Sequence, residues 1–167
     1  MDTLTRTHRV IDSPLGPLTL VGADGVLTGV RFDRHTRRPD AATTGQHDPS
    51  ALGDVVAQLD EYFAGHRTTF ELSVSPAGTD FEQSVWRLTS QIPYGETRSY
   101  GQLAAELGDP ALARAVGAAN GRNPVCIVVP CHRVIGADGG LVGYAGGLAR
   151  KRHLLDLESR SSGRTLF

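Results

Sequence analysis

The sequence predicts an α+β fold, with a small N-terminal α/β domain (a short antiparallel sheet plus one helix) followed by a mostly α-helical C-terminal domain. Three observations support this prediction. Short β-branched segments separated by turn residues dominate the chain before residue 33. Apolar residues recur at helical spacing from residue 79 onward. The stretch from Ser75 to Gly78 has the composition of a linker, so we expect domains at 1–75 and 79–167.

The start of the N-terminal domain has the pattern of a small sheet. Strands are expected at 10–12, 18–21 and 26–32. The dipeptide Asp24-Gly25 lies between the last two and is a strong signal for a hairpin turn. The polar segment 34–49 contains two prolines and a glycine, so we expect a variable loop there.

One helix and one further strand should complete this domain. Apolar residues fall at helical spacing from 52 to 63, with Ser50 as the expected cap and Gly65 as the stop signal. Residues 70–74 then alternate apolar and polar side chains, which favours one more strand.

The C-terminal domain is predicted to contain a helix-turn-helix at 99–120. A capping-box pattern at 79–82 opens the first helix of the domain. The motif itself consists of helices at 99–107 and 110–120, which meet at the turn Gly108-Asp109. An ordinary helical hairpin would give the same pattern, so this motif alone leaves the function open. A Gly-rich loop at 136–147 and a last helix close the chain.

The charge distribution favours contact with DNA. The formal net charge is only -1, and residues 1–78 carry 7 arginines against 10 acidic residues. Between Asp109 and Asp138 there is no acidic residue, whereas Arg114, Arg122 and Arg133 lie there. The second helix of the motif otherwise offers mostly Ala, Gly and Val, which read few base edges but allow a close approach to a groove. We therefore expect DNA binding without sequence readout.

The chemistry-bearing segment is Pro130-Cys131-His132-Arg133. A cysteine is nucleophilic as its thiolate, and nearby positive charge or a histidine base favours that form. We expect this segment to be extended, so that Cys131 and His132 point to opposite faces and a water links them. A buried core thiol is the alternative for Cys131, and it is the preferred interpretation of Cys126. Structural zinc at these residues is disfavoured because a second ligand pair is missing.

The two cysteines and the N-terminus bear on the cellular setting. Two cysteines make no disulfide framework, which favours a reducing environment. The first residues lack the apolar stretch of a signal peptide, and no apolar run approaches the length of a membrane span. We expect a soluble cytoplasmic protein with no membrane association.

Taken together, these residues resemble the O6-alkylguanine-DNA alkyltransferases. The resemblance covers 79–158 in family order, and only Ser13 to Leu18 match before it. Its most specific part is Pro130-Cys131-His132-Arg133-Val134 behind the Ala113-Arg114-Ala115-Val116-Gly117 helix. The other matching stretches are Thr79 to Trp86, Ile92 to Tyr100, Asn123-Pro124 and Gly143 to Gly147.

The resemblance implies a role for each matching residue. Cys131 would accept the alkyl group, His132 would deprotonate it through a water, and Glu158 would orient His132. Asn123 would brace the hinge before the active-site strand. Tyr100 would protonate N3 of the departing guanine and help to rotate the nucleotide, and Arg114 would fill the vacated place in the base stack. Further DNA contacts are expected from Ala115, Gly117, Ala118 and Asn120, and the substrate pocket from Trp86, Val134, Tyr144, Ala145, Gly146 and Gly147.

The implied activity is DNA repair by direct reversal. The alkyl group of O6-alkylguanine, and less readily of O4-alkylthymine, would move irreversibly to Cys131 after nucleotide flipping, with no cofactor or metal. The partner would be double-stranded DNA, bound through the minor groove by a monomer that could cluster on DNA. Cys126 and Ala145 depart from common family residues at the pocket. The alternatives are a non-catalytic lesion-binding protein, a Cys-His hydrolase and a plain helix-turn-helix regulator.

Overall fold

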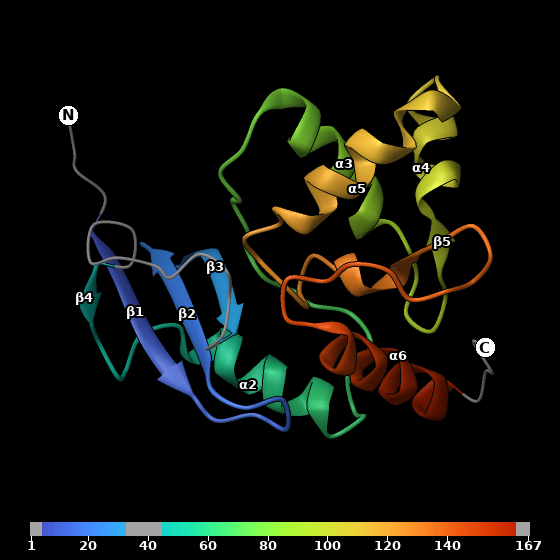
Figure 1. The fold of residues 1–167 in the computed structure, drawn as a ribbon. Coiled ribbons are helices and arrows are strands. Elements are labelled where there is room, and N and C mark those ends of the chain that lie inside the picture. Colours follow the sequence, from blue (N-terminus) through green and yellow to red (C-terminus); the bar gives the residue numbers. More distant parts are fainter. Residues whose placement is uncertain (1–4, 33–44, 163–167) are drawn as a thin grey trace. The chain divides into compact units, whose positions relative to one another are not determined.

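The computed structural model describes residues 5–32 and 45–162, and it divides into two compact units, Met1–Ala77 and Gly78–Phe167 (Figure 1). Among the described residues, the first unit holds a four-stranded sheet and one helix, and helices dominate the second. The predicted α+β class is therefore confirmed. Among the described residues, no helix is long and apolar enough to cross a membrane.

The N-terminal sheet has the strand order β3-β2-β1-β4. Its elements are β1 (Arg6–Ile11), β2 (Leu18–Ala23), β3 (Val26–Phe32) and β4 (Gln46–His47), and α2 (Gly53–Phe63) follows them. The β2-β3 hairpin turns at Asp24 and Gly25, whose φ angles of 51° and 80° are those that a tight hairpin turn requires. This confirms the hairpin prediction. β4 pairs with β1 in parallel, so the sheet is mixed where a purely antiparallel sheet was expected.

Three details of this unit differ from the sequence prediction. β4 lies inside the predicted loop 34–49, of which residues 34–44 fall outside the described residues. Ser50 does not cap α2, because its hydroxyl donates to Asp48 while Leu52 occupies the cap position with a φ of 57°. The expected strand at 70–74 is reduced to one bridge between Val74 and Leu27. The short β4 strand and the bridge at Val74 depend on pairing partners distant in sequence, whereas Ser50 is engaged by a neighbouring residue, Asp48.

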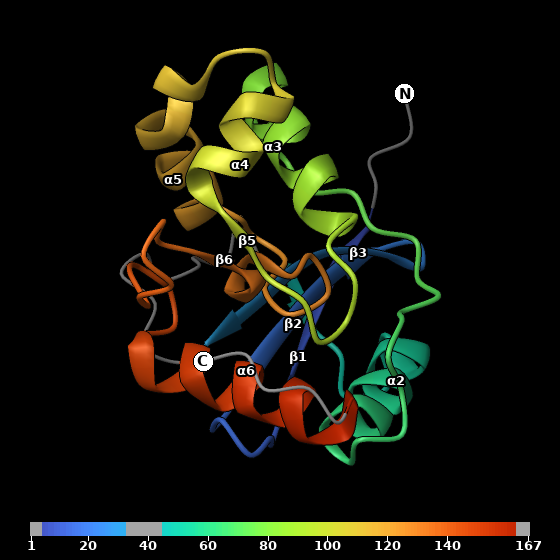
Figure 2. The same cartoon turned by 90° about the vertical axis from the view of Figure 1, so that its right-hand side faces the viewer.

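The C-terminal unit is built from helices around a very short two-stranded sheet (Figure 2). Its helices are α3 (Asp80–Ser90), α4 (Tyr100–Glu106), α5 (Ala113–Gly121) and α6 (Leu148–Ser162), with 3₁₀ turns η1 (Pro110–Leu112) and η2 (Cys131–Arg133). The strands β5 (Arg98–Ser99) and β6 (Val134–Ile135) pair in parallel. Because β5 leads directly into α4 and β6 follows η2, this pairing brings the start of α4 beside the end of η2.

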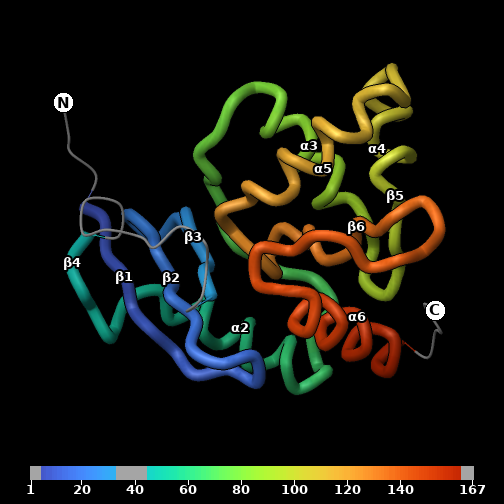
Figure 3. Tube along the Cα trace, viewed as in Figure 1, coloured from blue at the N-terminus to red at the C-terminus, as the bar shows by residue number. Residues whose placement is uncertain are grey.

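Side-chain caps define where these helices begin. Thr79 forms the predicted capping box, and Ser99 forms a second complete one at the start of α4. Asp109 caps the next segment through the backbone N–H of Ala111, but that segment begins as 3₁₀ turn η1 before it becomes α5. The helices α3, α4 and α5 pack together, and α6 lies on the other side of β5 and β6 in both views (Figures 1 and 2). The loop between β6 and α6 is easily followed in the Cα trace (Figure 3).

Candidate active site and DNA-binding surface

Cys131 lies in the single 3₁₀ turn η2 and is only 3% exposed. The predicted extended strand is therefore wrong at this point. A proline at 130 cannot donate a backbone hydrogen bond, and the N–H of Arg133 closes the turn onto the Pro130 carbonyl at 2.9 Å. His132 is fully buried in the same turn. Because these residues form a turn and not a strand, the expectation that the side chains of Cys131 and His132 alternate to opposite faces does not apply.

The backbone before Cys131 makes two tight reversals. The N–H of Val128 donates to the carbonyl of Cys126 at 2.8 Å around Ile127, whose φ is 73°. The N–H of Cys131 donates in the same way to Val129 around Pro130. Both are γ-turns, and the positive-φ form at Ile127 is unfavourable for a β-branched residue. Such strain at a buried position is typical of a functional site.

Asn123 holds this double turn from within. Its side-chain amide donates to the carbonyl of Val129 at 2.9 Å, and its side-chain oxygen accepts from the N–H of Val125 at 2.9 Å. The structure thus ties Asn123 to the backbone on both sides of the turn at Ile127.

His132 is paired with Glu158 of α6. Nε2 of His132 lies 2.7 Å from a carboxylate oxygen of Glu158, and both side chains are fully buried. Since a carboxylate only accepts hydrogen bonds, Nε2 carries the proton and Nδ1 has the free lone pair. Burial lowers the pKa of His132, although Glu158 opposes the shift. Nδ1 has no hydrogen-bond partner among the described residues, so it is available as a base.

Glu158 also carries a second buried partner, Arg133. The guanidinium of Arg133 donates to the two carboxylate oxygens at 2.8 and 3.1 Å, and to the carbonyl of Ile92 at 2.7 Å. Burial opposes ionisation of Glu158, but the charges and hydrogen bonds of His132 and Arg133 outweigh it and hold the pKa of this carboxyl below its usual range. Arg133 is therefore a structural counter-charge for Glu158, a role that the sequence did not reveal.

Several groups stabilise the thiolate of Cys131. A hydrogen bond from Cys126 contributes most, followed by the amide of Asn123 and the charge of Lys151, and together they lower the pKa of the Cys131 thiol against the opposing effect of burial. Cys126 is fully buried, and its thiol donates to the carbonyl oxygen of Asn123 at 3.8 Å.

Lys151 is the main residue that sequence reasoning missed. It is fully buried, and its ammonium donates to the carbonyls of Val134, Val142 and Gly143 at 2.7, 3.1 and 3.2 Å. Burial lowers its pKa to about 8. One signal could have found it, because Lys151 is the sole lysine among 17 basic residues.

Tyr100 stands at the start of α4, beside the loop that Lys151 holds. Its hydroxyl donates to the carbonyl of Val142 at 2.8 Å, and the Lys151 ammonium lies 5.8 Å from its ring centre. Burial, with a smaller effect of Cys131, raises the pKa of Tyr100, so the phenol keeps its proton. Its ring also backs onto Gly117 of α5, where an added Cβ would lie 3.7 Å away.

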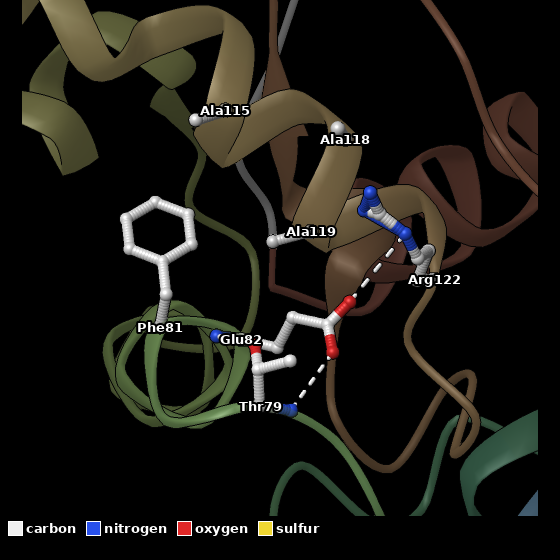
Figure 4. A pocket seen from close by; sticks show the side chains of 7 residues that line it. All are labelled: Thr79, Phe81, Glu82, Ala115, Ala118, Ala119 and Arg122. Atoms are coloured by element: carbon white, nitrogen blue, oxygen red, sulfur yellow. Dashed lines mark hydrogen bonds and ion pairs between the residues drawn. The ribbon is translucent and has the colours of Figure 1, made fainter.

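The side chains on the outer face of α5 are exposed, and most of them are small. Arg114, Ala115 and Ala118 are exposed on it. A groove of about 390 Å³ runs between this helix and the start of α3, with Phe81 on the α3 side (Figure 4). Its lining residues are Thr79, Phe81, Glu82, Ala115, Ala118, Ala119 and Arg122. Arg122 and Glu82 form an ion pair at 3.5 Å across it.

Two predicted contact residues lie elsewhere. Asn120 is 5% exposed, and its amide donates to the Cys131 carbonyl at 3.1 Å. Trp86 is 2% exposed, and its indole N–H donates to the carbonyl of Ala119 at 2.9 Å, which joins α3 to α5. These burials and hydrogen bonds assign Asn120 to the support of η2 and Trp86 to helix packing. We leave both out of the proposed DNA and substrate contacts.

The other predicted pocket residues belong to β6 and the loop that follows it. Val134 is fully buried, and its carbonyl accepts from Lys151. Tyr144, Ala145 and Gly146 are half-buried in the loop before α6, and Gly147 is exposed with a φ of 89°. Among the described residues, no cluster of three metal-ligating side chains is close enough to hold a metal ion.

The fold and the site define a class of protein: a helix-turn-helix unit that carries a buried, activated cysteine. The 6-O-methylguanine DNA methyltransferase family matches twice, through its DNA binding domain at residues 80–160 and its ribonuclease-like domain at residues 7–76. The chain belongs to this family.

Similar proteins extend over nearly the whole chain. The methylated-DNA–protein-cysteine methyltransferase of Mycobacterium bovis is 55% identical over 151 residues, which is 90% of this chain and 91% of the relative. The Methanosarcina acetivorans protein of the same name is 44% identical over 90% of this chain and 97% of the relative. The crystal structure of Mycobacterium tuberculosis OGT in complex with DNA superposes with a TM-score of 0.89 at 54% identity, covering 93% of this chain and 94% of that one.

Replacing Glu158 with Gln should lower the free energy of unfolding by roughly 3–5 kcal/mol, because Arg133 would stay buried without a counter-charge. The low pKa of Glu158 stabilises the folded state above the ordinary carboxyl pKa, and this contribution is lost as the pH falls. As the pH is lowered into the acid range, the free energy of unfolding should therefore decrease less in the variant than in the wild type. Urea unfolding followed by circular dichroism measures both.

The matched control is Glu61→Gln, which breaks a partly exposed ion pair with Arg67 at 3.1 Å. Its cost should not exceed about 1 kcal/mol. Equal losses in the two variants would contradict the structural role assigned to Glu158.

Proposed function

We propose that this protein repairs DNA by moving the alkyl group of O6-alkylguanine, and less readily of O4-alkylthymine, onto the sulfur of Cys131. Membership of the family gives the reaction class, transfer of a methyl group from DNA to a cysteine of the protein. The observation that carries the choice of acceptor is the environment of Cys131. Cys131 lies in the same buried turn as His132, whose Nε2 is held by Glu158 at 2.7 Å. Cys126, Asn123 and the charge of Lys151 also lower the pKa of the Cys131 thiol against the opposing effect of burial, which favours the thiolate.

The proposed chemistry uses the site residues in order. His132 takes the proton of Cys131 on Nδ1 through a water, while Glu158 fixes Nε2 as the protonated nitrogen. The thiolate then attacks the alkyl carbon, a C–S bond forms and the C–O6 bond breaks. The electron pair passes into the guanine, and Tyr100 supplies a proton at N3. The thioether on Cys131 is stable, so each molecule acts once.

The proposed DNA contact is the exposed face of α5 in the minor groove. Ala115, Gly117 and Ala118 are small enough to let the helix backbone approach DNA closely, without reading many base edges. Because O6 of a paired base cannot be reached inside the duplex, the nucleotide must rotate out, and Arg114 would occupy its place. We further propose that the protein binds as a monomer and that neighbouring copies cluster along DNA.

The first test is the mass of the protein after reaction with a duplex that carries one O6-methylguanine. We expect one added methyl group, located on Cys131 by fragmentation, and no turnover beyond one lesion per protein. Cys131→Ser is the matched control, because it should lose transfer and keep DNA binding. A methyl group on any other residue would overturn the assignment.

Arg114→Ala should slow repair of a paired lesion at least tenfold, since the extruded nucleotide would leave an unfilled gap in the stack. The rate with free O6-methylguanine should stay unchanged, because no stack has to be opened. Single-turnover rates on both substrates give the comparison, with Arg87→Ala as a control on another helix. Equal slowing on both substrates would remove the stacking role.

Tyr100→Phe should slow transfer from duplex DNA by roughly 10²-fold, the usual size of a general-acid contribution. The rate at which iodoacetamide modifies Cys131 should stay the same, because that reaction needs no guanine protonation. If the variant transfers methyl groups at the wild-type rate, Tyr100 is not the proton donor.

A further inference from the structure

One ion pair spans the groove between α3 and α5 (Figure 4). Of the described residues that line this groove, Arg122 is the sole cation and Glu82 is the sole anion. Nε of Arg122 lies 3.5 Å from a carboxylate oxygen of Glu82. The side chain of Arg122 is 54% exposed, whereas that of Glu82 is 14% exposed. The pair therefore joins an acid that is mostly covered to a base that lies largely in solvent.

The two partners are held very differently. The other carboxylate oxygen of Glu82 accepts the backbone N–H of Thr79 at 2.9 Å, as part of the capping box that starts α3. Among the described residues, the guanidinium of Arg122 is held by Glu82 alone, at more than the about 2.7–2.9 Å of a good charge-assisted hydrogen bond. Because partly exposed ion pairs add little stability, Arg122 can leave Glu82 at small cost, while Glu82 stays in place.

Arg122 continues the face of small residues that is proposed to contact DNA. It follows directly after α5, and Ala115, Ala118 and Arg122 have the spacing i, i+3, i+7 that places residues on one face of a helix. All three are exposed, and all three line the groove. At about 1.5 Å per residue, Arg122 lies about 10 Å beyond Ala115 along the helix axis.

A cation at this end of the helix is suited to a phosphate. A helix is about 10–12 Å in diameter and the minor groove about 6 Å wide, so side chains beside the small residues come against the phosphates that border the groove. The last carbonyl groups of α5 carry a partial negative charge, which repels phosphate. Arg122 offsets this repulsion at the same end of α5, whereas the carboxylate of Glu82 adds to it.

We infer that Arg122 is a ligand for a backbone phosphate of duplex DNA, and that it exchanges Glu82 for this phosphate when α5 docks. The inference rests on the proposed contact of α5 with DNA. Glu82 keeps its cap on Thr79 throughout, so α3 needs no rearrangement. Because a phosphate carries no sequence information, the contact serves every duplex alike.

The first test is the salt dependence of binding to an undamaged duplex, measured by fluorescence anisotropy. Arg122→Ala should weaken binding and reduce the slope of log affinity against log salt by about 0.9, because one phosphate contact is lost. Arg122→Lys keeps a cation and should keep the slope. Arg87→Ala removes an exposed arginine of α3 outside the groove and should change the slope less.

An unchanged slope in Arg122→Ala would overturn the inference. If circular dichroism shows that this variant does not fold, Arg122→Gln replaces it, because glutamine also lacks the charge and keeps more of the side chain.

Glu82→Gln tests the exchange itself. Glutamine still accepts the N–H of Thr79, so the cap is kept while the charge is lost. Binding should tighten by up to about fivefold, which corresponds to the stability of a partly exposed ion pair. Glu61→Gln makes the same change of net charge in the N-terminal unit and should leave binding nearly unchanged.

The double variant separates exchange from simple repulsion. In the Arg122→Ala background, Glu82→Gln should have much less effect, because no ion pair remains to be broken. An equal gain in both backgrounds would show that Glu82 acts by repulsion alone. Weaker binding by Glu82→Gln would show that the pair persists in the complex. Either result would overturn the exchange.

Methyl transfer, followed by the mass of the same proteins, keeps this inference distinguishable from the proposed function. If no methyl group reaches Cys131 but the slope falls in Arg122→Ala, the proposed function fails and the phosphate contact stands. If Cys131 is methylated but the slope is unchanged, the function holds and the phosphate contact is refuted.

Discussion

The buried carboxylate of Glu158 is the constraint on which the C-terminal unit depends. A fully buried charge is tolerated only when it is paired and hydrogen-bonded, and Glu158 receives both His132 and Arg133. His132 and Arg133 belong to η2, and Glu158 belongs to α6. The hydrogen bonds that compensate the buried charge of Glu158 therefore attach the turn η2 to the helix α6. The backbone N–H of Gly95 adds a weaker contact at 3.4 Å. The same carboxylate of Glu158 therefore orients His132 and anchors the turn η2 that carries Cys131.

The other side of the turn is tied to α5 in a comparable way. The amide of Asn120 holds the carbonyl of Cys131, and the amide of Asn123 holds that of Val129. These residues lie at the end of the helix whose outer face carries Arg114. A displacement of α5 would therefore also shift the backbone at Cys131. The strained γ-turn at Ile127, at a cost of about 1–3 kcal/mol, persists because both ends of the segment are held.

The sequence predicted those parts of the fold that are set by local chemistry. The capping box at Thr79 and the turn at Asp24 depend on neighbouring residues only, and both are confirmed. The segment Pro130 to Arg133 was expected to be extended but forms a 3₁₀ turn, because a single short turn leaves no periodic pattern in the sequence. Parallel pairing of β4 with β1 was equally invisible, since a two-residue strand depends on its partner and not on its own composition.

For the site, sequence reasoning found the residues whose chemistry is conspicuous and missed those whose role depends on burial. Lys151 and Arg133 look like ordinary surface cations in the sequence, but each is buried and saturated with acceptors. Asn120 was expected to face DNA because it lies on the recognition helix, yet the helix rotates it toward η2. Helical rotation places Ala115 and Ala118 outward, whereas Val116, Ala119 and Asn120 point inward.

In the proposed binding mode, the charges on the outer face of α5 determine how the protein contacts DNA. Arg114 is exposed there, and Arg122 is exposed but shared with Glu82 across the groove of Figure 4. Each phosphate that a protein neutralises contributes about 0.9 to the salt dependence of affinity. In the proposed binding mode, a helix with so few free cations in a protein of net charge -1 would rely on close backbone approach and on few phosphate contacts. The proposed mode therefore implies a modest and weakly salt-dependent affinity for undamaged duplex, which would let the protein leave an intact site and keep its single reaction for a lesion.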